Sequence, residues 1–369
     1  MLIVALGTIT MVSIASRQQL SMQRERNEGV IQMARDLAAS GERFAAALLY
    51  RDRKEALREN SDSLDDDWAQ TIPPVPIDNA AIQGCIIDMQ GRFNLNNLID
   101  AEGRAAPNYV AQFARLLGTL NIDLTKGQAV VDWLDTDLEA QVPDGAEDDY
   151  YTGLDQPYRA ANASFTSVSE LQLVKGFGTL SEEEREDYAL LVPHIAALPK
   201  SAEPSPVNVN TATPEVIKSL DDSYTAFGND LSRWETSAYE DYPECEDIFD
   251  LSADDDGPET IETDRDLQPW TSVQRFIADA GGEAPSEGEP DTAGEQPPID
   301  PATGLPREDP GAPGGPGVGD GNVLMSVSSR YFEARIDVIA EGLRLSQFTL
   351  FERDDAGRTR IVRRARDTI

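Results

Sequence analysis

The first fifty or so residues of this chain carry one continuous helical pattern. Residues 1–15 are apolar and uncharged, Arg17 follows, and an apolar stripe at helical spacing continues to Leu49. We predict a single helix about 75 Å long, at 1.5 Å per residue. Its first third is compatible with a membrane but shorter than the roughly twenty residues that span a bilayer, and the remainder is amphipathic.

The apolar run begins at Met1, with no charged segment before it and no secretory cleavage site after it. We therefore expect that an upstream portion is missing from this chain. A transmembrane anchor followed by a coiled-coil stalk is the simpler alternative for the same pattern.

A dense acidic stretch lies in the middle of the chain. Residues 132–149 contain eight carboxylates in eighteen positions, together with Trp133 and Leu134, and Tyr150 and Tyr151 follow. Like charges at this spacing repel strongly unless a cation or solvent lies between them. The apolar residues predict a loop folded onto a core, so we expect a hard divalent cation, with Ca²⁺ as the natural candidate and a plain solvated loop as the alternative.

This stretch only partly matches an EF-hand. Three carboxylates at alternate positions match the start of that calcium loop: Asp135, Asp137 and Glu139. However, Ala140 stands where the EF-hand needs glycine, and Ala146 stands where it needs a bidentate glutamate. The residues favour a calcium loop of another geometry, bent at residues 143–145 and closed by Glu147 and Asp148.

The overall composition limits the class of partner. A chain of 369 residues with 40% hydrophobic residues can form two or three domains with buried cores. Its net charge of −36 opposes binding to phosphate backbones, which requires a basic face. A calcium-accessible compartment suits this charge, and solubility or a salty habitat would account for it equally well.

The two cysteines leave two alternatives open. Cys85 lies in an apolar run and Cys245 lies in an acidic segment that contains proline. In an exported domain they would form one long-range disulfide, and otherwise they are two buried thiols. Neither belongs to a CxxC motif, which argues against a zinc knuckle or a thiol redox site.

The segments after the first helix alternate between strand and helix patterns. Residues 72–95 are rich in Pro and then in β-branched residues, and predict a hairpin, or a strand that enters a turn, at Gln90 and Gly91. Short amphipathic helices are predicted at 110–117, 127–134, 167–174 and 181–191.

Two pairs of similar sequence segments, which we call the first and second internal echo, predict related helical modules over 96–200 and 207–282. The paired segments are residues 93–99 with 207–217, and residues 165–171 with 270–276.

Strand patterns return near the C-terminus. They follow residues 283–321, which are rich in Pro, Gly, Glu and Asp and are expected to form a disordered linker. Alternation from residue 331 onward predicts antiparallel strands, with residues 354–357 as a hairpin turn. Five arginines there predict a solvated edge strand, or a surface for an acidic neighbour: Arg358, Arg360, Arg363, Arg364 and Arg366. The predicted long helix covers residues 1–56, and the predicted sheet covers residues 72–95 and 323–366. The two helical modules cover residues 96–200 and 207–282, and the linker covers residues 283–321.

Six ordered blocks resemble one known family. They are GRFNLNNL at 91–98, DWLDTD at 132–137, GAED at 145–148 before two tyrosines, YRAAN at 158–162, SEL and VKG at 169–176, and VNVNTA at 207–212. These blocks resemble the K-class minor pseudopilins of the bacterial type II secretion system (the GspK family). The resemblance covers nearly the whole chain outside residues 283–321.

This resemblance implies an α+β fold with a pilin-like long N-terminal helix, an antiparallel sheet, and a large inserted all-α domain that is SAM-like or helix-hairpin-helix-like. It implies a non-enzymatic protein that caps the tip of a periplasmic pseudopilus with the I-class and J-class minor pseudopilins, above the major pseudopilin. It also implies cleavage of a precursor by the prepilin peptidase, and a single-pass inner-membrane anchor with a periplasmic C-terminal domain. The implied structural Ca²⁺ carries ligand candidates onto Asp132, Asp135, Asp137, Glu147 and Asp148.

Other functions fit the residues less well. His194, the only histidine, follows Pro193 in an apolar stretch and is expected to be structural rather than a general base. Residues 208–212 resemble the opening of helix-hairpin-helix modules of DNA-uptake proteins, but the acidic residues that follow repel phosphates. A membrane-anchored, calcium-binding adhesin or receptor remains the main alternative.

Overall fold

The chain forms two compact units. The computed structural model describes residues 2–55, 61–70, 72–178, 181–201, 203–221, 324–340 and 343–368. Of these, unit 1 contains residues 2–91 and 327–368, and unit 2 contains residues 92–221 and 324–326. Unit 2 is therefore an insertion between two segments of unit 1.

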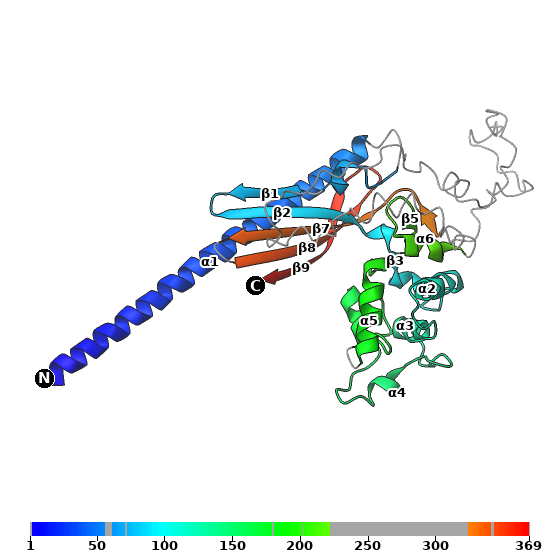
Figure 1. Ribbon diagram of the computed structural model, residues 1–369, viewed down its shortest axis with the longest axis horizontal. Helices are drawn as coiled ribbons and strands as arrows, with labels where there is room; N and C mark the ends of the chain where they lie inside the picture. Colours follow the sequence, from blue (N-terminus) through cyan, green and yellow to red (C-terminus); the bar gives the residue numbers. More distant parts are fainter. Residues whose placement is uncertain are drawn as a thin grey trace, which may run out of the picture. The chain divides into compact units, whose positions relative to one another are not determined.

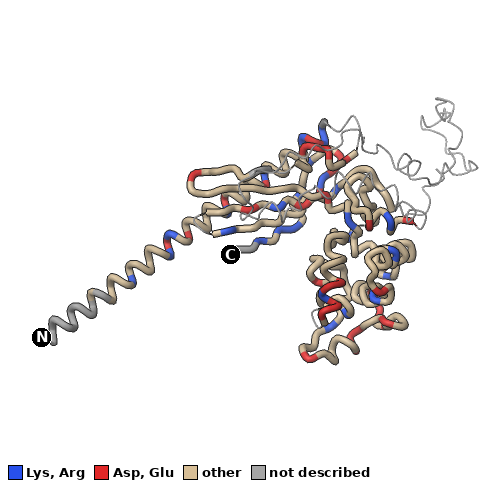
Figure 2. Tube along the Cα trace, viewed as in Figure 1, with Lys and Arg blue, Asp and Glu red and all other residues tan. Residues whose placement is uncertain are grey.

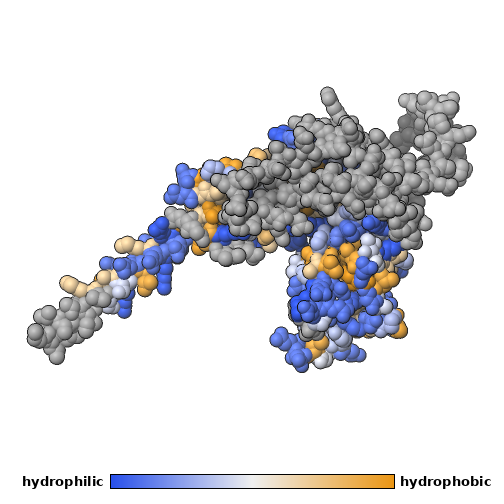
Figure 3. All heavy atoms as spheres, in the orientation of Figure 1, coloured by the Kyte–Doolittle hydropathy of each residue, from blue (hydrophilic) through white to orange (hydrophobic). Residues whose placement is uncertain are grey.

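A single helix, α1 (Leu2–Glu55), runs for 54 residues and confirms the predicted long helix. Its C-terminal part lies along the sheet of unit 1, and its N-terminal part projects beyond the sheet (Figure 1). The projecting part exposes isolated apolar side chains such as Met11 and Met22, while most of its described surface in Figure 3 is hydrophilic. Among the described residues, no helix is long and apolar enough to cross a membrane.

Five antiparallel strands form the sheet of unit 1, in the order β1-β2-β7-β8-β9. Their bounds are β1 (Ile72–Ile77), β2 (Ala80–Asp88), β7 (Tyr331–Ala340), β8 (Leu343–Arg353) and β9 (Thr359–Thr368). The predicted hairpin between the last two strands is confirmed, and Gly357 adopts φ +82 in its turn, which L side chains rarely tolerate. A long helix with an antiparallel sheet confirms the mixed α+β class.

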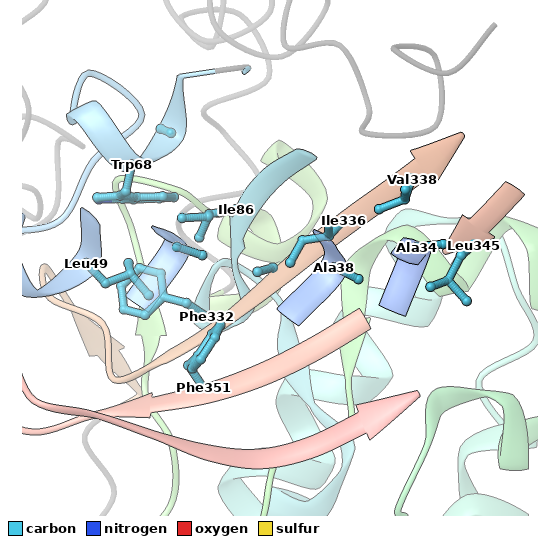
Figure 4. Packing of buried hydrophobic residues seen from close by; sticks show 13 residues of the cluster. Ala34, Ala38, Leu49, Trp68, Ile86, Phe332, Ile336, Val338, Leu345 and Phe351 are labelled. Carbon is cyan, nitrogen blue, oxygen red and sulfur yellow. The ribbon is translucent and has the colours of Figure 1, made fainter. Parts of the chain in front are cut away.

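The core of unit 1 lies between α1 and the sheet (Figure 4). Small residues of α1 face the sheet, and larger side chains fill the end of this core near the 3-10 turn η2 (Asp67–Ala69). There the rings of Trp68 and Phe332 meet edge to face, with centroids 5.2 Å apart. The buried residues of this cluster on α1 are Ala34, Ala38, Ala45 and Leu49.

Unit 2 is built mainly of short helices: α2 (Pro107–Thr119), α3 (Lys126–Leu134), α4 (Asp148–Tyr151), α5 (Glu182–Leu191) and α6 (Pro214–Leu220). The bounds of α2, α3 and α5 are close to the predicted ones, whereas α4 and α6 were not predicted as separate helices. The segment predicted as a helix at 167–174 is the 3-10 helix η5 (Val168–Leu173). Ser181 begins α5 with a capping box, in which its hydroxyl accepts from the Glu184 amide at 3.1 Å.

Two short parallel ladders also occur in unit 2, which the prediction of an all-α insertion did not include. They are β3 (Phe93–Asn94) with β4 (Ile195–Ala196), and β5 (Val207–Asn208) with β6 (Met325–Ser326). Both begin at the Asn-containing segments of the first internal echo, so these two segments share a local structure. The second echo involves residues 270–276, which lie outside the described residues.

The first Asn-containing segment ties distant parts of unit 2 together. The buried Asn96 amide donates to the carbonyls of Phe165 (3.0 Å) and Leu198 (2.7 Å). Asn97 exchanges two hydrogen bonds with the backbone of Ser205. Because buried backbone groups must be paired, these side chains hold together three segments that are far apart in the sequence.

The turn at Gln90 and Gly91 and the pairing of Cys85 were two further expectations. Of the two alternatives at Gln90 and Gly91, the hairpin is wrong, because β2 pairs with β1 and β7 and then enters the 3-10 turn η3 (Met89–Gly91). Cys85 is buried and disulfide-bonded, whereas its expected partner Cys245 lies outside the described residues, as do most of the predicted second module and the predicted linker.

Candidate metal centre

The candidate site lies where α3 ends in the acidic loop. Asp132 and Asp135 are three residues apart at the end of α3, so they lie on one face of the helix. The chain then makes an exposed loop and returns at Glu147, the residue before α4. Figure 2 shows acidic residues gathered along this loop and on α5.

Three carboxylates of this loop converge. One oxygen from each of Asp135, Asp137 and Glu147 lies within 4.8 Å of the other two. Asp135 and Glu147 are each only 5% exposed, whereas Asp137 is exposed. Asp135 Oδ1 and both carboxylate oxygens of Glu147 are buried with no hydrogen-bond partner, which is unusual because buried polar atoms are normally paired.

Asp132 closes the loop behind this group. Its Oδ2 accepts hydrogen bonds from the backbone amides of Gln141 (3.1 Å) and Ala146 (2.8 Å), and its Oδ1 is buried without a partner. Gly145 lies against the same carboxylate, since a Cβ there would be 2.2 Å from Asp132 Oδ2. The loop conformation therefore depends on both residues.

The fifth predicted ligand is held elsewhere. Asp148 Oδ1 accepts from the Ala160 amide at 3.1 Å, and its Oδ2 lies 3.6 Å from the Arg159 guanidinium. Asp148 therefore lies outside the group of three, although its charge acts on Glu147. Asp144 is likewise neutralised separately, by Lys175 at 3.6 Å.

The electrostatics of the group reflect its burial. Desolvation, together with repulsion from neighbouring carboxylates, raises the pKa of Asp135 to about 6 and that of Glu147 to about 7. Burial likewise raises the pKa of Asp132. Among the described residues, no Lys, Arg or His forms an ion pair with Asp132, Asp135, Asp137 or Glu147.

Aromatic side chains support the group from the core side. Tyr151 is fully buried, and its ring lies 5.2 Å from that of Trp133 and 5.3 Å from that of Tyr158. These apolar anchors explain why an acidic loop folds inward. They also remove water from the carboxylates, which is the physical cause of the raised pKa values.

These residues fit a hard divalent cation. Ca²⁺ binds six to eight oxygens at about 2.3–2.6 Å, so two ligands of one ion can be up to about 4.8 Å apart. The oxygens of Asp135, Asp137 and Glu147 satisfy that limit, and the free Oδ1 of Asp132 is a fourth candidate. Zn²⁺ prefers nitrogen and sulfur ligands, and the group contains neither His nor Cys.

A second carboxylate group, which was not predicted from the sequence, lies in unit 1. One oxygen from each of Asp52, Asp62 and Asp66 also lies within 4.8 Å of the others. Here a buried guanidinium is present, because Arg353 Nη1 lies 2.9 Å from Asp52 and Nη2 contacts Asp62. The acidic run at residues 65–67 was the available signal, but nothing local indicated Arg353.

The residues considered for other functions are structural in unit 2. His194 Nδ1 lies 2.8 Å from the Thr213 hydroxyl, and burial lowers the pKa of this imidazole. Asn208, Asn210 and Thr211 of the segment that resembles DNA-uptake modules are buried. They are therefore unavailable to a nucleic acid.

Comparison with known proteins identifies relatives of this chain. Residues 91–200 match the model of the family "Type II secretion system (T2SS), protein K". Type II secretion system protein K of Pseudomonas aeruginosa is 40% identical over 228 residues, which cover 60% of this chain and 65% of that protein. The protein of the same name from Aeromonas hydrophila is 33% identical over 233 residues, covering 58% of this chain and 67% of the relative.

The fold also matches a solved structure. A chain of the crystal structure of the GspK-GspI-GspJ complex from the type 2 secretion system of enterotoxigenic Escherichia coli aligns with a TM-score of 0.62 at 20% identity. The alignment covers 93% of this chain and 99% of that chain. From the family match and the two relatives, the chain belongs to the type II secretion system protein K family.

Proposed function

We propose that this protein is a non-enzymatic minor pseudopilin of a type II secretion system. It caps the tip of a short periplasmic pseudopilus together with I-class and J-class minor pseudopilins, and so supports the export of folded proteins. Family membership carries this proposal, and a fold neighbour that was crystallised with GspI and GspJ supports the choice of partners.

The N-terminal part of α1 serves two roles in this proposal. Its apolar, uncharged residues 1–15 would hold the protein in the inner membrane before assembly and pack against the major pseudopilin afterwards. A prepilin peptidase would process the precursor. Unit 2 is then the inserted helical domain, related to SAM-like or helix-hairpin-helix folds, and is exposed in the periplasm.

Calcium has a structural role in this proposal. The group of Asp135, Asp137 and Glu147, with Asp132 behind it, concentrates buried negative charge that no described side chain neutralises. A bound Ca²⁺ would neutralise that charge, join the end of α3 to the start of α4, and rigidify the exposed loop between them.

The partner assignment is tested by co-purification. The protein, expressed with its I-class and J-class partners, should elute as a ternary complex that survives about 1 M salt, because the apolar surface of α1 rather than surface charge carries the association. The control omits one partner at a time. A protein that elutes without either partner, even when both are co-expressed, would favour the adhesin or receptor alternative.

The calcium assignment is tested on the isolated protein. Terbium, which substitutes for Ca²⁺, should bind close to Trp133 and show luminescence sensitised by excitation of that indole. Excess Ca²⁺ should remove the signal and Mg²⁺ should not, because Mg²⁺ requires a tighter octahedral shell and keeps its waters. Luminescence that Asp135→Asn with Asp137→Asn leaves unchanged would exclude this site.

A further inference from the structure

The contact between α1 and the sheet of unit 1 contains many small residues on the helix side. Its buried alanines are Ala34, Ala38 and Ala45, beside the buried Leu49 and the partly buried Leu37 and Leu48. Gly41 also lies against the sheet, since a Cβ there would be 3.0 Å from Ile336 Cγ2. Small side chains interlock weakly with the opposite surface, so this part of the contact contributes little to fixing the position of the helix along the sheet.

A buried carboxylate interrupts this apolar stripe. Glu42 is 5% exposed, and its carboxylate accepts hydrogen bonds from Arg364 of β9, with Nε at 2.6 Å from Oε1 and Nη2 at 2.5 Å from Oε2. The Thr349 hydroxyl (2.8 Å) and the Gln347 amide (3.3 Å) also donate to Oε1. Thr349 and Gln347 are on β8 and are fully buried.

A second buried carboxylate lies near the end of the helix. Asp52 is 8% exposed and pairs with Arg353 at the end of β8, at 2.9 Å. The Arg353 guanidinium is itself 2% exposed, contacts Asp62, and lies 4.5 Å from the ring centroid of Phe332. Its Nη2 also donates to the Ser329 carbonyl at 3.1 Å.

These two contacts lie at different places around and along the helix. Glu42 and Asp52 are separated by about 15 Å along the axis and by about 80° around it, at 1.5 Å and 100° per residue. Glu42 therefore lies at one border of the buried stripe, whereas Asp52 lies within it, at the same angle as Ala34. A shift of one turn would move both carboxylates about 5.4 Å from their guanidinium partners, and a buried charge without its partner is strongly unfavourable.

We propose that Glu42 and Asp52 are positioning residues that fix the register of α1 on the sheet, both along the helix axis and around it. The buried apolar stripe holds α1 against the sheet, and the two ion pairs stabilise one register of α1 over the others. The consequence for a filament rests on the proposed pseudopilin function. There, this register would set the height and rotation at which unit 1 is carried on its filament helix, and would transmit axial force between them.

The test is disulfide trapping in the full chain, with cross-links mapped by mass spectrometry so that those of the native cysteines are distinguished. Gly41→Cys with Ile336→Cys reports the register of the structure, because the two positions are in direct contact. Ala38→Cys or Ala45→Cys with Ile336→Cys reports a helix displaced by about one turn. The parent protein should give only the 41–336 link.

The variant Glu42→Ala/Asp52→Ala should lower the ratio of the 41–336 link to the displaced links by about tenfold or more, since the competing registers no longer leave these charges unpaired. The matched control is Asp36→Asn, which removes an exposed carboxylate from the same helix and should leave the ratio unchanged. The charge exchange Glu42→Arg/Arg364→Glu should restore the native link relative to Glu42→Arg alone.

An unchanged ratio in the folded double variant would overturn the proposal. If that variant fails to fold, Glu42→Gln/Asp52→Asn decides by the same ratio, because the amides keep the shape of the contact and remove its charge. The ratio is measured on the isolated protein, so it does not depend on partners. Failure to assemble with an intact ratio would count against the pseudopilin proposal alone.

Discussion

The two carboxylate groups of this protein make an instructive comparison. Each brings three carboxylates within 4.8 Å of one another, and in each burial raises pKa values: Asp52 to about 6 and Asp66 to about 7 in unit 1, and Asp135 to about 6 and Glu147 to about 7 in unit 2. They differ in the source of positive charge. Unit 1 supplies a buried guanidinium from its own chain, whereas the described part of unit 2 supplies none.

This difference separates an internal ion pair from a candidate metal site. In unit 1, Arg353 occupies the position that a cation would take between Asp52 and Asp62. In unit 2, four buried oxygens remain unpaired, and the proposed Ca²⁺ would balance them. Clustered carboxylates alone therefore do not indicate a metal site, and an internal cation such as Arg353 has to be looked for first.

The largest expected effect comes from removing the internal cation. Arg353→Met leaves Asp52 and Asp62 buried without their partner, and should lower the free energy of unfolding by about 3–5 kcal/mol. The control is Arg358→Met, whose guanidinium is 77% exposed and pairs with Asp354, and which should cost less than about 1 kcal/mol. Urea unfolding measures both, and equal effects would show that Arg353 does not support the buried group.

The second effect comes from the external cation. At a hundredfold excess over its dissociation constant, Ca²⁺ should stabilise the protein by about 2.7 kcal/mol, and Asp135→Asn/Asp137→Asn should abolish this increment. In excess chelator the same variant should be no less stable than the parent, because it removes buried repulsion. Glu139→Gln, on the exposed part of the loop, is the control and should leave the calcium increment intact. Thermal unfolding with Ca²⁺ and with chelator tests both expectations. A double variant that is less stable than the parent protein in chelator would contradict the second one.

A smaller effect is expected from the loop conformation. Gly145→Ala would place a Cβ 2.2 Å from Asp132 Oδ2 and 2.4 Å from the Gln141 nitrogen, so the loop must shift at a cost of about 1–3 kcal/mol. Calcium affinity, measured by terbium competition, should fall with it. Gly29→Ala has no neighbour within 4 Å in α1 and should instead be neutral or stabilising by up to about 1 kcal/mol.

The last expected effect is a pH dependence of the metal-free protein. The folded pKa values of Asp135 and Glu147 lie above the unfolded ones, so the folded state binds more protons between roughly pH 4 and 7. Stability from these groups is present at low pH and is lost as pH rises through about 6 to 7. With Ca²⁺ the trend should reverse, since the ion binds the deprotonated carboxylates. Melting curves at pH 5 and 7.5 check both signs, and parallel trends would count against the site.

Part of the site was predictable from the sequence because its residues are close together along the chain. The density of carboxylates between Trp133 and Tyr150 indicated an inward-folded loop, and three of the five candidate ligands converge, with Asp132 behind them. The position of Asp148 outside the group of three was not predictable, because it depends on how α4 turns this side chain towards Arg159 and Ala160.

The sequence by itself determined the elements whose signals are local: the continuous helix α1, the capped α5, the β8–β9 hairpin and the acidic loop. Only the tertiary structure decided which charges meet. Arg353 reaches Asp52 across 301 residues, and Arg364 reaches Glu42 across 322. The physical reason is that periodicity and capping depend on neighbours within a turn or two, whereas charge compensation depends on distances in the folded chain and on burial.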